Sequence, residues 1–109
     1  MRIVLSISLV LYHNDPEDIK RLLGSLANVR TAFRLYVVDN SKEQNLASLF
    51  QGDERIVYEH VNENLGFAKA HNRILKNLDN QFKYHLIVNP DVYFDEDVLS
   101  PMIQYLEED

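Results

Sequence analysis

The sequence has no cysteine and no tryptophan, and it contains only three isolated glycines and three prolines in 109 residues. Without cysteine the chain has neither disulfides nor thiolate metal ligands, a composition compatible with a reducing cytoplasm. Without a glycine-rich loop, neither the dinucleotide-binding fingerprint nor the phosphate-binding P-loop can be written on this chain. A phosphate site would therefore need another way to bind the charge, and the physical alternative is a divalent cation held by carboxylate oxygen.

Basic residues are also scarce, since 11 Lys and Arg stand against 17 Asp and Glu, for a net charge of −6. A nucleic-acid-binding surface needs a clustered basic face, so this balance argues against a nucleic-acid partner. The apolar run at residues 3–11 is too short to span a bilayer, which takes about 20 residues, and no small-residue cleavage site follows it. With 46% hydrophobic residues, the chain can bury the core of one domain.

Strand-like and helix-like patterns alternate along the chain. Continuous apolar runs predict strands at residues 3–11, 33–38, 55–61 and 84–88. A helical spacing of apolar residues follows each run. The expected helix starts are Asp15 before Pro16, a capping box of Ser41 with Gln44, Phe67, and either Asp97 or Ser100. This order predicts an α/β fold with a mainly parallel sheet, helices on both of its faces and a first strand buried on both sides.

Polar side chains stand where three of these strands end. The first strand leads into His13-Asn14-Asp15, the second into Asp39-Asn40 and the fourth into Asn89-Pro90-Asp91. Because the carboxyl ends of parallel strands share one edge, and ligands bind in the crevice outside it, we expect these groups to face one ligand. Asp91 is the expected metal ligand there, since hard cations such as Mg²⁺ take one or two protein carboxylates.

Three motifs, taken in order, carry a family resemblance. They are Val37-Val38-Asp39-Asn40-Ser41, then Asn64-Leu65-Gly66-Phe67-Ala68-Lys69-Ala70-His71-Asn72, then Val88-Asn89-Pro90-Asp91. In order and spacing they resemble the family 2 glycosyltransferases, most closely the rhamnosyltransferase-like members. The resemblance implies a Rossmann-like GT-A fold that binds nucleotide-diphospho-sugars. It also implies that residues 1–109 are the N-terminal donor-binding part of a longer enzyme, with the fold incomplete at the C-terminus.

The resemblance assigns a set of residues to the nucleotide-sugar donor. They are Leu11, Tyr12, Asp39, Asn64, Gly66, Lys69 and Asn89. Leu11 and Tyr12 would border the nucleoside, and Asp39 would accept a hydrogen bond from the imide N–H of uracil or thymine, a donor that cytosine lacks. The side chain of Lys69 and the loop before it would lie beside the base and the phosphates.

The metal motif departs from the family's usual Asp-x-Asp, because Asn89 replaces the first acid. By resemblance, Asp91 would bind Mg²⁺ or Mn²⁺ against the pyrophosphate, and the amide oxygen of Asn89 would contact the metal or the ribose. One carboxylate fewer predicts weaker metal binding than in the two-carboxylate version. The four histidines are scattered without ligand spacing and are not expected to bind metal.

The reaction implied is inverting, metal-dependent transfer of a sugar from a UDP- or dTDP-sugar to a glycan or a lipid-linked acceptor, in cell-surface polysaccharide synthesis. The general base would lie beyond Asp109, so this chain alone is expected to bind the donor without turning it over. The enzyme would be cytoplasmic, working at the inner face of the membrane as a peripheral protein.

Two alternatives stay open from the residues alone. A phospho-receiver signalling domain has a similar length and an aspartate at a strand end, although this chain has no lysine near Asp91 to complete that site. A structural relative with no retained ligand is the other alternative, since a fold does not fix a function. Locally, Asp39 could simply start a turn, Gly66 could be a loop exit and Lys69 could be a solvated charge.

Overall fold

The computed structural model describes residues 3–42, 46–78 and 82–108. Its elements follow the predicted alternating order. They are β1 (Leu5–Leu11), α1 (Pro16–Ala27), β2 (Phe33–Asp39), the 3-10 helix η1 (Ala47–Phe50), β3 (Ile56–His60), α2 (Phe67–Lys76), β4 (Tyr84–Val88) and α3 (Leu99–Glu107). All strand pairs are parallel, in the order β3-β2-β1-β4. The predicted parallel α/β sheet is therefore confirmed.

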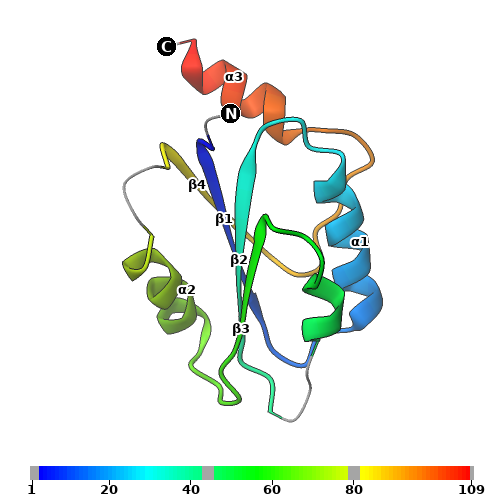
Figure 1. Ribbon diagram of the computed structural model, residues 1–109, viewed down its shortest axis with the longest axis vertical. Helices are drawn as coiled ribbons and strands as arrows, with labels where there is room; N and C mark the ends of the chain where they lie inside the picture. Colours follow the sequence, from blue (N-terminus) through cyan, green and yellow to red (C-terminus); the bar gives the residue numbers. More distant parts are fainter. Residues whose placement is uncertain (1–2, 43–45, 79–81, 109) are drawn as a thin grey trace.

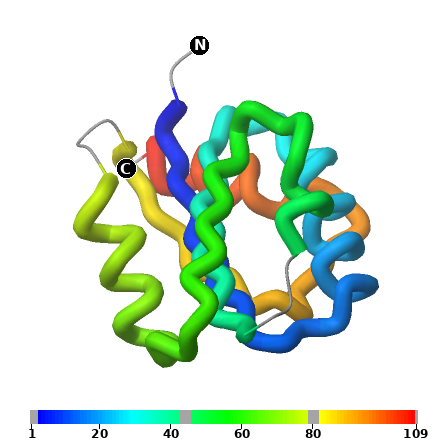
Figure 2. The backbone as a smooth tube through the Cα atoms, turned by 60° about the horizontal axis from the view of Figure 1, so that its bottom comes forward, coloured from blue at the N-terminus to red at the C-terminus, as the bar shows by residue number. Residues whose placement is uncertain are grey.

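Helices cover both faces of the sheet, as Figure 2 shows with α2 on one side and α1 and η1 on the other. The register aligns Leu11, Asp39 and His60 at the carboxyl ends of β1, β2 and β3, while β4 ends opposite Leu9. These ends lie at the bottom of Figure 1, and α3 crosses the top, beside the amino ends of the strands. The carboxyl edge is thus left clear of α3.

The two faces of the sheet differ in chemistry. Alternate side chains of β1 point to opposite faces, so Leu5, Ile7, Leu9 and Leu11 enter the main core under α1. Ser6 and Ser8, also fully buried, point to the face under α2. The expectation that β1 is buried on both sides is therefore confirmed, although two of the buried side chains on the α2 face carry hydroxyls.

The segment after β2 also differs from its prediction. Instead of an α-helix started by a Ser41 capping box, the chain forms the four-residue 3-10 helix η1, whose N-cap Leu46 makes no side-chain cap bond. Gln44, the other member of that capping box, lies outside the described residues. Phe50 is nevertheless buried, as the apolar spacing predicted.

The N-cap of α3 is Val98, which makes no side-chain cap bond, so the expectation that Asp97 or Ser100 is the cap was wrong. Asp97, the residue before Val98, nevertheless bonds the start of the helix. Asp97 accepts the backbone N–H of Ser100 through Oδ1 at 3.0 Å and that of Arg30 through Oδ2 at 2.9 Å. The hydroxyl of Ser100 instead accepts the backbone N–H of Thr31 at 2.9 Å. These bonds fasten α3 to the turn between α1 and β2. No helix in the described part of the chain is long and apolar enough to cross a membrane.

Candidate functional site

Three strand exits are tied together at the carboxyl edge by Ser41, which is fully buried. Its hydroxyl accepts the backbone N–H of His13, after β1, at 2.7 Å. Its carbonyl oxygen accepts the Nε2–H of His60, the last residue of β3, at 2.7 Å. Because Asn40 donates its backbone N–H to the carbonyl of Leu11 at 2.8 Å, the exits of β1, β2 and β3 are hydrogen-bonded into one rim.

Asp39 ends β2 at the centre of this rim and is completely buried. Its Oδ1 accepts the backbone N–H of Ser41 at 2.9 Å, and its Oδ2 accepts the hydroxyl of Tyr58 at 2.7 Å. Burial, helped by the Asp39 carboxylate, raises the pKa of Tyr58 well above its usual value, so the phenol stays a hydrogen-bond donor. Asp39 therefore has a structural role in this conformation, and any ligand must reach it through an opened rim.

Tyr12 and Leu11 lie differently at the same edge. The side chain of Leu11 is fully buried in the main core, so Leu11 meets the edge only through its backbone. The ring of Tyr12 is 52% exposed and packs edge-on against His13, with ring centroids 4.5 Å apart. His13 adopts a left-handed backbone, with φ of 51°. Tyr12 is thus an aromatic surface on which a flat ring can stack.

The start of α2 lies at the same edge, as its position at the bottom of Figure 1 shows. Asn64 accepts the backbone N–H of Gly66 through Oδ1 at 3.0 Å, which closes the turn before the helix. Gly66 is the N-cap residue, and its φ of 81° with ψ of 166° is a conformation that favours glycine. The helix then begins without a side-chain cap, so its first N–H groups face the edge, and Lys69 is exposed one turn along.

Asn89 and Asp91 follow the buried Val88 in a turn closed by the backbone N–H of Val92 and the carbonyl of Asn89, at 3.2 Å. Both side chains are exposed, and within the described residues neither takes part in a hydrogen bond or an ion pair. Asp91 thus differs from Asp39, whose two oxygens are both occupied. The carboxylate of Asp91 is therefore available to a cation.

The segment after Asp91 is fastened to α1. Ser25 donates its hydroxyl to the carbonyl of Phe94 at 3.0 Å and accepts the backbone N–H of Phe94 at 2.8 Å. The guanidinium of Arg21 lies 4.8 Å from the ring centroid of Tyr93. Among the described residues, no group of three or more His, Asp or Glu side chains forms a ready-made metal cage. The donor set at Asp91 therefore fits a hard cation that takes most of its ligands from phosphate and water.

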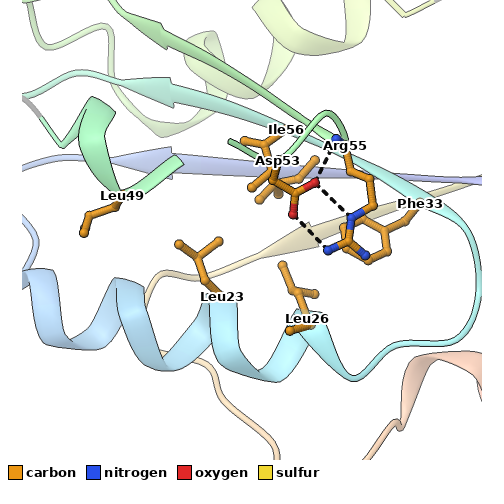
Figure 3. A pocket seen from close by; sticks show the side chains of 9 residues that line it. Leu23, Leu26, Phe33, Leu49, Asp53, Arg55 and Ile56 are labelled. Atoms are coloured by element: carbon orange, nitrogen blue, oxygen red, sulfur yellow. Dashed lines mark hydrogen bonds and ion pairs between the residues drawn. The ribbon is translucent and has the colours of Figure 1, made fainter. Parts of the chain in front are cut away.

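A small cavity of about 120 Å³ lies at the opposite end of the sheet, under α1 (Figure 3). At its mouth Asp53 binds Arg55 through two hydrogen bonds, at 3.0 and 2.9 Å, and the guanidinium lies 4.6 Å from the ring centroid of Phe33. The hydrogen bond from Arg55 lowers the pKa of Asp53. Since each charge already has its partner, this cavity is a packing feature at the amino edge of β2 and β3.

The sequence prediction missed Ser41, Tyr58 and His60 at the rim. Asp39 with a serine two residues later is the usual signature of an Asx turn, and this signal was readable. The partners from β3 could not be read locally, because they meet Asp39 and Ser41 only after β2 and β3 pair. The predicted residues Tyr12, Asp39, Asn64, Gly66, Asn89 and Asp91 all lie at or beside the carboxyl edge.

Comparisons with known proteins agree over nearly the whole chain. The sequence model described as glycosyl transferase family 2 matches residues 8–109. The crystal structure of S. aureus TarS matches with a TM-score of 0.79 and 24% identity, over 96% of this chain and 20% of that chain. S. aureus TarS 1-349 matches with a TM-score of 0.78 and 21% identity, over 96% of this chain and 32% of that chain.

A third matching structure is S. aureus TarS 1-349 in complex with UDP, with a TM-score of 0.77 and 25% identity, over 96% of this chain and 32% of that chain. This chain therefore spans about a fifth to a third of the TarS chains it matches. The search of curated proteins found no match.

Proposed function

We propose, since this chain belongs to glycosyl transferase family 2, that its carboxyl edge binds the nucleotide of a nucleotide-diphospho-sugar donor. The predicted family and GT-A fold are confirmed, which decides against the phospho-receiver alternative. The observation that carries the proposal is the free carboxylate of Asp91 beside the rim and the uncapped start of α2. The UDP in the matching TarS 1-349 structure supports a nucleotide donor.

Different residues of the chain bind the base and the diphosphate of the donor. Tyr12 offers its exposed ring to the base, and Asp39 accepts the imide N–H of uracil or thymine with the lone pairs that Tyr58 and Ser41 leave unused. Because Asp39 is fully buried, the base reaches it only when the rim at Tyr12 and His13 opens. The first N–H groups of α2 and the ammonium of Lys69 face the diphosphate, which a helix N-terminus favours.

Asp91 would hold Mg²⁺ or Mn²⁺, with the amide oxygen of Asn89 beside it. When bound there, the cation neutralises the charge that grows on the departing diphosphate. The chain's contribution to transfer is thus to fix the leaving group. A general base for the acceptor hydroxyl is still required, and we place it, with the acceptor site, beyond Asp109.

Residues 1–109 then form the N-terminal donor-binding part of a longer glycosyltransferase. The support is that 96% of this chain matches only 20–32% of the TarS chains. The proposed reaction is inverting transfer from a UDP- or dTDP-sugar to a glycan or lipid-linked acceptor in cell-surface polysaccharide synthesis. The proposed location is the cytoplasm, at the inner face of the membrane.

Calorimetric titration of the chain with UDP, dTDP and CDP, each with and without Mn²⁺, tests this function. We expect UDP or dTDP to bind more tightly with Mn²⁺, and CDP to bind more weakly because cytosine lacks the imide N–H. Asp91→Asn should abolish the effect of Mn²⁺. Asp95→Asn is the matched control, because Asp95 is an exposed carboxylate four residues away. Absence of binding in every combination would favour a structural relative without a ligand.

A further inference from the structure

Four polar side chains between the sheet and α2 form a hydrogen-bonded line, which consists of Ser6, His85, Ser8 and His71. The hydroxyl of Ser6 on β1 lies 2.6 Å from Nδ1 of His85 on β4. Nε2 of His85 lies 3.1 Å from the hydroxyl of Ser8, which lies 2.8 Å from Nδ1 of His71 on α2. The side chains of three elements therefore form one continuous line from the edge strand to the helix.

With both imidazoles neutral, the protons of this line can be placed in two ways. If Ser6 donates to the carbonyl of Tyr84, at 3.4 Å, His85 Nδ1–H donates to Ser6 and His71 Nδ1–H donates to Ser8. If Ser6 instead donates to His85, every bond in the line reverses. A protonated His85 would donate to the oxygens of both Ser6 and Ser8, so the line can accommodate a proton on His85.

One end of the line is unfinished. Nε2 of His71 is buried and has no hydrogen-bond partner among the described residues, and His71 is only 3% exposed. The ring of Phe67 packs against the His71 ring with centroids 4.3 Å apart. A proton added at this nitrogen would therefore create a buried charge with no oxygen to accept it.

The surrounding charges do not compensate. On the same sheet face the register puts Arg34 of β2 opposite Ser6 and Tyr36 opposite Ser8. On β3, Glu59 is already paired with Arg73 of α2. Lys83, before β4, binds Glu107 of α3. The register therefore places a cation, Arg34, beside the line, and the carboxylates of Glu59 and Glu107 already have cationic partners.

We infer that Ser6, His85, Ser8 and His71 form an acid-sensitive latch, which holds α2 on the sheet while His71 is neutral and releases it when His71 gains a proton. The helix is otherwise attached to this face by a small apolar cluster built on Val38, Ala70 and Ile74 and by the ion pair of Arg73 with Glu59. Loosening of α2 also frees the turn at Gly66, which is the helix N-cap at the carboxyl edge.

The direction of the response follows from the protonation equilibria. Burial lowers the pKa of both imidazoles below the ordinary value of 6.5, and the charge of His85 lowers the pKa of His71 further. An unfolded or detached helix thus binds more protons than the latched one. The latch is at full strength above 6.5 and weakens as the pH falls below that value toward the lowered pKa values.

Amide hydrogen exchange of the whole chain at pH 7.5 and pH 5.5, corrected for intrinsic exchange rates, tests the latch. We expect the α2 amides and Gly66 to exchange about tenfold faster at pH 5.5, with β1 and β2 unchanged. The double variant His71→Gln, His85→Gln should lose this pH dependence. His13→Gln should keep it, because the His13 side chain is exposed and outside the line. Equal pH dependence in the double variant, or none in the wild type, would overturn the inference.

A second measurement does not depend on whether the variants fold. Long-range ¹H–¹⁵N spectra of the wild-type imidazoles report the charge state of each ring directly. We expect His71 and His85 to stay neutral at pH values below 6.5, and His71 to gain its proton together with the faster exchange of α2. Protonation of His71 without a change in α2 would contradict the latch.

A third measurement, the affinity for UDP at two pH values, rests on the proposed function. If UDP binds at pH 7.5, its affinity should fall at pH 5.5 more in the wild type than in the double variant, which corrects for titration of the diphosphate itself. Equal losses would remove the link between the latch and the donor site. Failure of UDP to bind at pH 7.5 counts against the proposed function alone, because the exchange measurement needs no nucleotide.

Discussion

The two faces of the sheet are built from the same strands but differ in how they hold their helices. Under α1, large apolar side chains of β1 and β2 pack against those of α1, and the polar Asp39 at the edge has both oxygens bonded. Under α2, the apolar cluster is small, and the hydrogen-bonded line ends on His71 Nε2, which has no partner among the described residues. The first face stabilises the fold, and the second holds a helix whose start serves the candidate site.

The largest expected effect comes from removing the same side chain on each face. Ile7→Ala, in the core under α1, should lower the free energy of unfolding by about 3–5 kcal/mol, because Ile7 is fully buried among large neighbours. Ile74→Ala, under α2, should cost about 2 kcal/mol, because fewer apolar groups surround it. Urea unfolding measures both variants. Equal losses of free energy of unfolding would contradict the proposed difference between the α1 and α2 faces.

Removing a tyrosine hydroxyl on each face should have the next largest effect. Tyr58→Phe leaves the buried Asp39 carboxylate with an unpaired oxygen and should cost about 1–3 kcal/mol. Tyr36→Phe, on the α2 face, should cost less than about 0.5 kcal/mol, since no hydrogen bond of its hydroxyl is found within the described chain. The two unfolding midpoints give the answer, and a costly Tyr36→Phe would contradict this account of the α2 face.

Two glycine substitutions, one at the N-cap of α2 and one inside α1, should change the free energy of unfolding in opposite directions. Gly66→Ala should destabilise the chain by about 1 kcal/mol, because its φ of 81° strains any residue with a Cβ. Gly24→Ala, inside α1 with open space around its Cβ position, should stabilise the chain by about 0.5–1 kcal/mol through higher helix propensity. Thermal unfolding measures both, and a stabilising Gly66→Ala would show that this turn does not hold its glycine conformation.

The smallest of these effects concerns how α3 is fastened beside the α1 face. Asp97→Asn should cost about 0.5–1 kcal/mol, since it weakens the bonds that Asp97 accepts from Arg30 and Ser100. Although burial raises the pKa of Asp97, its hydrogen bonds outweigh that effect and lower the pKa. The wild type should therefore lose this stability as the pH falls below about 3.8, the usual value, and the variant should not. Urea unfolding at pH 6 and pH 3.5 compares them, and the same pH dependence in the variant would refute this role for Asp97.

Local sequence patterns predicted the elements better than the contacts between them. The range of β4 agrees with its prediction, and α1 starts at the predicted Pro16 with Asp15 as its cap. The segment at η1 forms a 3-10 helix instead of the predicted α-helix. Apolar spacing over so few residues could not distinguish the two kinds of helix. The sequence shows the two serines of β1, but it does not show that their hydroxyls bond histidines of β4 and α2. Those partners meet only once the chain is folded.

The same limit applies to the candidate site. Asp39 and Asp91 could both be recognised in the sequence as acids at strand ends. The sequence does not show how they differ: both oxygens of Asp39 accept hydrogen bonds, whereas those of Asp91 accept none from the described residues. The partner of one Asp39 oxygen is Tyr58, 19 residues away along the chain. A pairing of this kind is set by sheet order and register rather than by any local pattern.

The location of Mn²⁺ in the presence of UDP tests the central claim most directly. Paramagnetic broadening in the ¹H–¹⁵N spectrum of the chain marks the amides nearest the ion. The account predicts broadening at residues 89–92 and around Ser41 and Gly66, and its loss in Asp91→Asn. Broadening confined to the acidic residues 95–97 or 107–108, unchanged in that variant, would contradict a donor site at the carboxyl edge.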